Sequence, residues 1–500
     1  MESIQLAIAI AVLVSLAIYC WRLNPGRVAK LCLPPGPTLL SGSLPGKDIA
    51  TTFQKWSREY GPVVSFSIGG RTFIILGTRQ AAQDLLEKRG NIYSSRAPSV
   101  WMDKYLYKGL AAAFMPYGAE WRLNRRLHGS LLGVHQTNAY RYLQDIQSKY
   151  LLHEFLSTDD FSHGFHQYTS NVMFTLVYGK ERGRDNGDHR RLEQINDMAS
   201  FILRGASSWT LLLDLFPILD RLPRFWWTWR TEAATLHDKT KAVYRECCET
   251  ALTADCWNWS REVTGKRDIM ALPWDHVCYS LGELYVAGIH TTKMVLDIFV
   301  LVSVLYPTVV SKAQRELDSI VGSDRMPSFD DLDQLPFINA IISELLRWRP
   351  ISPIAVPHAV MQDDEYMGYF IPRGATIVAN QYGMNMDESI FGDPTRFRPE
   401  RYIENPELPV AAFGFGRRAC PGHRLARSSL FIVISRLLWG YDITSADKQG
   451  PLESSSPSSV KAAFHVRSPR RQGIIEQDWD LAEKDDGVIL DEIQSRFRRT

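Results

Sequence analysis

Cysteine is scarce in this chain of 500 residues, and it occurs in no metal-binding spacing. The seven cysteines are odd in number and form neither CxxC pairs nor the Cys/His pattern of a zinc site. This argues against a disulfide scaffold and favours a reducing compartment. The remaining composition, with 45% hydrophobic and 22% charged residues, is that of a folded globular protein.

The chain also lacks a strong net charge, internal repeats and nucleotide-binding motifs. Its net charge is +2, and no basic stripe with interleaved aromatic residues is present, so nucleic acid is not an expected partner. The absence of a repeat of about 20 to 50 residues argues against a solenoid. No flavin or nicotinamide motif is present, so redox chemistry would need electrons from a separate protein.

One long uncharged run, residues 4–21, stands near the N-terminus. At about 1.5 Å per residue it just spans the hydrocarbon layer of a bilayer. Arg22, Arg27 and Lys30 follow it, so the positive-inside rule places the rest of the chain in the cytosol. A cleaved secretory signal is the alternative, but the charged n-region and a small-residue cleavage site are missing. We predict a single-pass anchor in the endoplasmic reticulum membrane.

Four segments follow from the patterning: an anchor at 1–22, a proline-rich hinge at 23–50, a catalytic domain at 51–475 and a charged tail at 476–500. Pro34, Pro35 and Pro37 make the hinge a stiff spacer. A loop is expected near 485–487, and no chemistry is assigned to the tail. Apolar periodicity predicts helices at 51–60, 79–89, 121–132, 139–156, 192–203, 231–252, 278–305, 309–321, 336–348 and 422–438. Strands are expected only at 63–68, 72–76 and 376–379, so the fold class is mainly α with small β-sheets.

The segment 413–422, FGFGRRACPG, carries the most specific chemistry. Its glycines permit backbone conformations that turn N–H groups toward the sulfur of Cys420. We expect Pro421 to open the next helix, whose N-terminus would stabilise a low-pKa thiolate. The alternative is an ordinary buried cysteine.

The full pattern FGxGRRxCxG resembles the haem-binding loop of the cytochrome P450 family. The resemblance implies haem b as the cofactor, with Cys420 as the axial thiolate ligand of the iron. It also implies that Phe413 packs beside the thiolate, that Gly416 belongs to the cofactor-binding residues of the loop, and that Arg418 reaches a haem propionate. A thiolate ligand favours cleavage of the O–O bond, which is monooxygenase chemistry.

Three further elements are similar to family motifs. Glu344 and Arg347 share one helix face, and Arg401 lies in FRPERY, which is similar to the family's PERF element. The family resemblance makes these three a structural triad that supports folding and takes no part in catalysis.

Trp121 and Arg125, at i and i+4 on one helix, resemble the family's pair that binds a haem propionate. An amphipathic surface is the alternative for this pair. His358 matches another position that faces a propionate.

The third element is AGIHTT at 287–292, which resembles the family's A/G-G-x-D/E-T-T signature over the haem. Gly288 and the hydroxyl of Thr291 are expected to let the helix bulge and hold water near dioxygen. His290 departs from the pattern, since an acidic residue is usual there. Because histidine titrates near pH 6.5, His290 is a candidate proton relay, although delivery could instead be impaired.

The substrate is expected to be a lipophilic small molecule that arrives from the membrane. The apolar stretches 286–289 and 353–356 would line the space above the iron, with 101–114 as a lid and the aromatic segment 211–229 at the bilayer surface. The details resemble fungal members that oxidise natural products. Arg122, Arg126 and Arg424 could dock the acidic surface of a separate NADPH-cytochrome P450 reductase.

The resemblance therefore implies a haem-thiolate monooxygenase that inserts one oxygen atom into a C–H or C=C bond in fungal secondary metabolism. Two alternatives remain open. One is a haem-thiolate isomerase or dehydratase that uses no reductase. The unusual His290 is the residue that leaves this alternative open. The other is a haem sensor without turnover.

Overall fold

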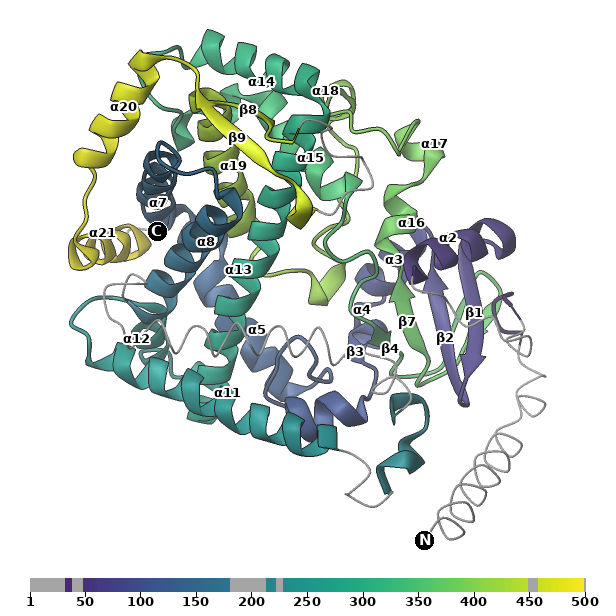
Figure 1. Ribbon diagram of the computed structural model, residues 1–500. Helices are drawn as coiled ribbons and strands as arrows, with labels where there is room; N and C mark the ends of the chain where they lie inside the picture. Colours follow the sequence, from purple (N-terminus) through teal and green to yellow (C-terminus); the bar gives the residue numbers. More distant parts are fainter. Residues whose placement is uncertain (1–31, 38–47, 180–212, 222–227, 448–456, 499–500) are drawn as a thin grey trace, which may run out of the picture.

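The computed structural model describes residues 32–37, 48–179, 213–221, 228–447 and 457–498. Helices form most of this part, and a five-stranded sheet lies at one edge (Figure 1). The predicted class, mainly α with small β-sheets, is confirmed. The predicted anchor at 4–21, the helix predicted at 192–203 and most of the aromatic segment 211–229 lie outside the described residues.

The α-helices occupy eighteen segments of the described chain. In chain order they are α2 (Ile49–Tyr60), α3 (Arg79–Ala82), α4 (Gly90–Tyr93), α5 (Ala119–Leu132), α6 (Val134–Ala139), α7 (Arg141–Glu154), α8 (Phe161–Tyr178), α11 (Thr228–Thr253), α12 (Trp259–Thr264), α13 (Trp274–Leu305), α14 (Pro307–Ile320), α15 (Pro336–Trp348), α16 (Gln381–Asn385), α17 (Glu388–Phe391), α18 (Glu400–Glu404), α19 (His423–Gly440), α20 (Pro469–Asp480) and α21 (Asp486–Arg498). Two π-helical turns, Gln83–Lys88 and Val100–Leu106, accompany them.

Nine short strands form three sheets. They are β1 (Val63–Ile68), β2 (Arg71–Leu76), β3 (Ser95–Arg96), β4 (His358–Ala359), β5 (Asp364–Tyr366), β6 (Tyr369–Ile371), β7 (Thr376–Ala379), β8 (Tyr441–Ser445) and β9 (Ala462–Val466). The main sheet has the order β1-β2-β7-β4-β3, and β5-β6 and β8-β9 are separate hairpins. The predicted hairpin at 63–76 is present, and its turn places Gly69 and Gly70 at positive φ.

The long helix α13 crosses the molecule and packs along α8 (Figure 1). Within the described residues, α13 is the only helix with the length and apolarity of a membrane span, but most of it is buried in the protein core. It is therefore a core helix. The sequence did not predict α8, because nearly all of its faces are buried and its apolar residues show no stripe at helical spacing.

The proline-rich segment 32–37 contacts the folded body. The carbonyl of Pro35 accepts a hydrogen bond from the Ser65 amide at 3.0 Å, and the carbonyl of Cys32 accepts one from Phe370 at 2.8 Å. A Cβ on Gly36 would lie 1.8 Å from the Ser65 carbonyl oxygen, so only glycine fits here. The hinge predicted as a spacer is thus fixed to β1 and β6 at this point.

The charged C-terminal tail is folded. A loop at 481–485 separates α20 from α21, so the loop predicted at 485–487 is wrong for Asp486 and Gly487, which form the first turn of α21. Ile489, Leu490 and Ile493 of α21 are buried in the main hydrophobic cluster. Both helices lie beside α7 (Figure 1).

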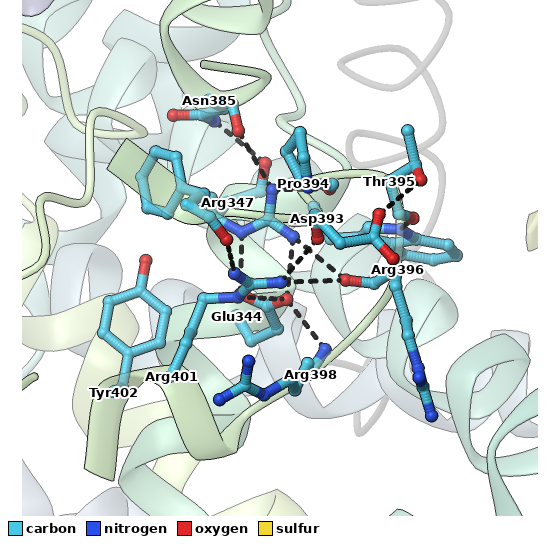
Figure 2. Close-up of polar contacts among 12 residues, drawn as sticks. Glu344, Arg347, Asn385, Asp393, Pro394, Thr395, Arg396, Arg398, Arg401 and Tyr402 are labelled. Carbon is cyan, nitrogen blue, oxygen red and sulfur yellow. Dashed lines mark hydrogen bonds and ion pairs between the residues drawn. The ribbon is translucent and has the colours of Figure 1, made fainter. Parts of the chain in front are cut away.

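A fully hydrogen-bonded ionic group lies between α15 and α18 (Figure 2). The carboxylate of Glu344 accepts two bonds of 2.7 Å from the Arg347 guanidinium and one of 3.1 Å from Nε of Arg401. The Arg398 amide adds a bond of 2.9 Å. Glu344 and Arg347 are completely buried, so the predicted structural triad is confirmed.

The two arginines also fix the irregular chain that leads from α16 to α18. Arg347 donates to the carbonyls of Asn385 at 3.0 Å and Pro394 at 2.9 Å, and Arg401 donates to that of Asp393 at 2.9 Å. This segment precedes the Cys420 loop, so the triad sets the path by which the chain approaches it.

We predict that Glu344→Gln lowers the free energy of unfolding by about 3–5 kcal/mol, because it leaves two buried guanidiniums without a full counter-charge. The soluble yield and the melting temperature measure the loss. Glu388→Gln is the control, since the exposed pair of Glu388 with Arg58 is worth less than about 1 kcal/mol. Equal effects of the two substitutions would contradict a structural role for the triad.

Candidate functional site

An apolar cavity of about 240 Å³ lies where α13, α8, the end of α15 and the Cys420 loop meet. Cys420 and Phe413 line it on one side, and Ala287, Gly288 and Thr291 line it on another. The rest of the lining is mostly aliphatic and includes Leu132, Val172, Met173, Leu284, Val295, Leu346, Ile351, Leu425 and Leu430. Cys420 is the only described cysteine among the lining residues.

The loop that carries Cys420 is held by backbone geometry. The Cys420 amide donates to the Phe413 carbonyl at 2.8 Å, which closes the loop. Gly416 has a φ of +57°, and a Cβ on it would lie 2.0 Å from the Leu86 carbonyl oxygen. Gly416 therefore serves the close approach of the loop to the turn Gln83–Lys88, and Phe413 and Cys420 both line the cavity.

Two expectations about this loop are wrong. Helix α19 begins at His423 with Gly422 as its N-cap, so Pro421 lies in the turn before the helix and not at its first position. Burial raises the pKa of the Cys420 thiol, while the Gly422 amide and the charge of Arg125 oppose this only in part. The loop alone thus does not produce the low-pKa thiolate that we expected.

The face of α13 toward the cavity is formed by residues one helical turn apart. Ala287 and Thr291 are exposed on this mostly buried helix, as is Met294, and Thr291 Oγ1 donates to the Ala287 carbonyl at 2.7 Å. The helix continues unbroken from Trp274 to Leu305, so the bulge expected at Gly288 is not present. A Cβ on Gly288 would lie 2.5 Å from Met173 Sδ, so this glycine permits the close contact between α13 and α8.

His290 does not line the cavity. Its ring faces His166 of α8, with 6.2 Å between the ring centroids, and its Nε2 has no hydrogen-bond partner in the described part of the chain. Burial and the nearby charge of Lys293 lower its pKa. Lys293 in turn donates to Asp297 and Ser162, each at 2.6 Å.

Positively charged residues gather at the sheet side of the site. Arg418 donates to the carbonyls of Ser94 at 2.8 Å and Met115 at 2.6 Å, and its guanidinium carbon lies 4.3 Å from the centroid of the Trp121 ring. Arg96 on β3 lies directly opposite His358 on β4, so the two side chains share a face of the sheet.

Burial lowers the pKa of these groups, and neighbouring positive charges add to the effect at Arg418 and His358. Burial, together with the charges of Arg96 and Arg125, lowers the pKa of Arg418 to about 9. Burial lowers the pKa of Arg96 to about 10. The pKa of His358 is lowered to about 3, chiefly by burial. Since Nδ1 of His358 lies 2.7 Å from the Tyr93 carbonyl and donates to it, Nε2 of the neutral ring carries no proton.

The residues fit a flat cofactor that bears carboxylates and a metal. Arg125 is half-buried, yet neither its guanidinium nor the indole N–H of Trp121 has a hydrogen-bond or ion-pair partner among the described residues. With Arg96 and Arg418 they offer donors for two carboxylates. In the described chain no three His, Cys, Asp or Glu side chains could hold a metal, so Cys420 would need a non-protein group to complete the coordination.

The sequence had pointed to Trp121, Arg125, His358 and Arg418, but it gave no sign of Arg96. A lone arginine after a short loop carries no local signal, and only the pairing of β3 with β4 brings it beside His358. The predicted lining is also partly different: Ala287 and Gly288 line the cavity, whereas Ile351 and Ser352 take the place expected for 353–356.

Comparisons with known proteins agree with this geometry. Residues 33–469 match the family described as Cytochrome P450. The chain is 37% identical to the cytochrome P450 monooxygenase aneD of Aspergillus aculeatus over 98% of each chain, and 37% identical to FrzL of Cladobotryum over 94% of each. A solved zebrafish cytochrome P450 with progesterone, 24% identical, has a TM-score of 0.69 over 85% of this chain and 99% of that one.

Members of this family bind haem b through an axial cysteine thiolate, and both fungal relatives are named as monooxygenases. The described cavity presents one cysteine to such a group, and the partly buried cations at the sheet side of the site suit its carboxylates. The chain belongs to the cytochrome P450 family and is a haem-thiolate monooxygenase.

Proposed function

We propose that this monooxygenase inserts one atom of O2 into a C–H or C=C bond of a lipophilic small molecule in fungal secondary metabolism. The observation that carries the proposal is a single apolar cavity in which Cys420 and the Ala287–Thr291 face of α13 both take part. Its aliphatic lining suits a substrate with little charge. The other oxygen atom leaves as water, and two electrons come from a reductase.

Cys420 would hold the iron, and Trp121, Arg125, Arg418 and Arg96 would hold the two propionates. His358 would join them only as a charged ring, because its neutral form presents an acceptor at Nε2. When bound, haem supplies the oxygen-activating chemistry, which a thiolate ligand directs toward O–O cleavage. The protein's own part is to exclude water, orient the substrate and deliver protons.

We predict that Cys420→Ser abolishes the red-shifted absorption band that thiolate ligation gives the ferrous carbon monoxide complex, because a serine oxygen cannot replace the sulfur ligand. Absorption spectra of the purified, reduced protein test this. Cys32→Ser is the control, since Cys32 is exposed and lies far along the chain from the cavity lining. A wild-type protein without the red-shifted band would refute the assignment of Cys420.

Proton delivery is proposed to use Thr291 and His290. The Thr291 hydroxyl lies on the cavity face, and His290 lies one residue, about 100°, further round the helix. A neutral imidazole can accept a proton and pass it on, and the neighbouring His166 and Lys293 are not part of the cavity lining. Because His290 is not part of the lining, an isomerase or dehydratase that acts through its ring is disfavoured.

We predict that His290→Ala reduces the amount of product formed per NADPH oxidised, because electrons are then lost without coupled protonation. Product and NADPH are measured together in the reconstituted system. His163→Ala is a matched control, since His163 is exposed on the same helix as His166. The relay is ruled out if His290→Ala leaves both product formation and coupling at the wild-type level.

The electron donor is proposed to be a separate NADPH-cytochrome P450 reductase. Three exposed arginines support this proposal: Arg122 and Arg126 on α5, and Arg424 at the start of α19, just after the Cys420 loop. The ring of Tyr117 lies 5.7 Å from the Arg122 guanidinium and 5.3 Å from that of Arg417, which links α5 to the loop. Such a basic surface suits an acidic flavoprotein.

We predict that Arg122→Glu with Arg424→Glu slows reduction by the reductase at least about tenfold at low salt, since charge complementarity chiefly governs the association rate. Stopped-flow reduction under carbon monoxide measures this rate. Reduction by dithionite should be unchanged, and Arg470→Glu, a single charge reversal at an exposed arginine on α20, is the control for charge reversal away from the proposed surface. A rate that does not respond to salt or to these charges would place the docking surface elsewhere.

Membrane attachment is also proposed, through the apolar run 4–21, with the catalytic part in the cytosol and the endoplasmic reticulum as the membrane. The basic residues after the run support this orientation. The contacts of residues 32–37 with β1 and β6 would then hold the body close to the bilayer, which suits the uptake of a lipophilic substrate.

A further inference from the structure

One short turn, residues 111–115, forms the end of the predicted lid segment 101–114 just before α5, and it is bound from both sides. Its amides face α13: the N–H groups of Ala112 and Ala113 donate to the carboxylate of Glu283 at 2.8 and 3.1 Å. Glu283 is partly buried and precedes Leu284, which lines the cavity. A carboxylate that accepts two amides at once holds a turn in a defined orientation.

The carbonyl groups of the same turn face the cationic side of the cavity. Those of Ala112 and Met115 accept bonds from Arg418 at 3.1 and 2.6 Å. That of Ala113 accepts a bond of 2.8 Å from Arg96. The turn therefore joins Glu283 to both of the arginines that would pair with haem propionates.

A simple capping role is the competing interpretation, and the chain contains a matched example. Glu316 on α14 also accepts two consecutive amides, those of Phe337 at 2.9 Å and Ile338 at 3.1 Å, at the start of α15. Burial raises its pKa as well. The Glu316 carboxylate lies away from the cavity lining, so it provides the same local contact without the link to Arg96 and Arg418.

We propose that Glu283 is a positioning residue for the cofactor, one that fixes the 111–115 turn and thereby holds the Arg96 and Arg418 guanidiniums toward the propionates. The proposal rests on the proposed function, because it needs a haem in the cavity. It assigns a role in holding the cofactor to a residue that is not itself part of the cavity lining.

The ionisation of Glu283 is sensitive to pH near neutrality. Burial raises its pKa to about 7, although the Ala113 and Ala112 amides and the charges of Arg418 and Arg96 oppose the shift. The other titratable groups that face it are tyrosines on three elements, Tyr107, Tyr244 and Tyr279, whose pKa values its charge raises. They stay neutral from pH 6 to pH 8, so Glu283 is the group of this cluster that changes charge there.

The test is Glu283→Gln in the full-length holoprotein, which keeps the shape but offers one acceptor oxygen in place of two. We expect transfer of haem to excess apomyoglobin at pH 8 to be about tenfold faster than in the wild type, as expected for a lost charge-assisted hydrogen bond. Amide hydrogen exchange in the peptide that contains 111–115 should also be faster. Toward pH 6 the two proteins should converge, because the wild-type carboxyl is then protonated.

Stability separates positioning from capping. Since the pKa of Glu283 is raised in the folded state, its ionisation lowers stability as pH rises through about 7, and the neutral glutamine removes that penalty. We therefore expect little loss of melting temperature at pH 8 in Glu283→Gln. Glu316→Gln should show wild-type haem transfer at both pH values.

Each outcome decides a different point. Equal haem transfer by wild type and Glu283→Gln at pH 8 would overturn the role of Glu283 and leave the proposed function intact. Faster transfer that is matched by Glu316→Gln would show a general loss of stability, which also overturns it. A wild-type protein that binds haem without the thiolate band would refute the proposed function alone, and one that binds no haem would overturn both.

Discussion

The structure is organised around positive charge that is partly buried beside an apolar cavity. Arg96, Arg125 and Arg418 come from a strand, a helix and a loop, and removal from water lowers the pKa of each. Such charges are tolerated only where carbonyl groups or an anionic partner surround them. Backbone carbonyls accept hydrogen bonds from the guanidinium groups of Arg96 and Arg418. The Arg125 guanidinium has no hydrogen-bond or ion-pair partner in the described chain. Carbonyl groups near the sheet thus stabilise two of these charges, and the third favours an anionic ligand in the cavity.

The Glu344 group also contains buried positive charge, but here the protein itself supplies the counter-charge. Its carboxylate and the guanidiniums of Arg347 and Arg401 are matched within the protein, and carbonyls of the 385–396 segment bind the remaining N–H groups. Nothing there is available to a ligand, so this group is structural. Comparison of the two clusters shows that the degree of internal pairing, more than the presence of buried charge, marks the functional site.

Sequence reasoning located the parts of the site that have a local signature. The Cys420 loop, the i, i+4 spacing of Trp121 and Arg125, and the Glu344–Arg347 pair were each visible in short segments. What it missed depends on tertiary packing: Arg96 is placed by strand pairing, and Glu283 by a turn more than 160 residues earlier in the chain. Helix α8 had no apolar stripe because the core surrounds it, and the helices of the tail were not predicted because only a narrow buried face carries the packing of α21.

The wrong expectation about the Cys420 thiol explains how the site and its cofactor depend on each other. Helix α19 starts two residues after Pro421, so its dipole acts on the sulfur mainly through the Gly422 amide, which is too little to offset burial. A metal ion lowers the pKa of a thiol ligand far more strongly than a helix end does. A haem would bring a cation to Cys420 and two anions to the arginines, and thus compensate both ends of the cavity at once. Charge complementarity of this kind ties cofactor binding to the stability of the lid, the sheet edge and the loop together.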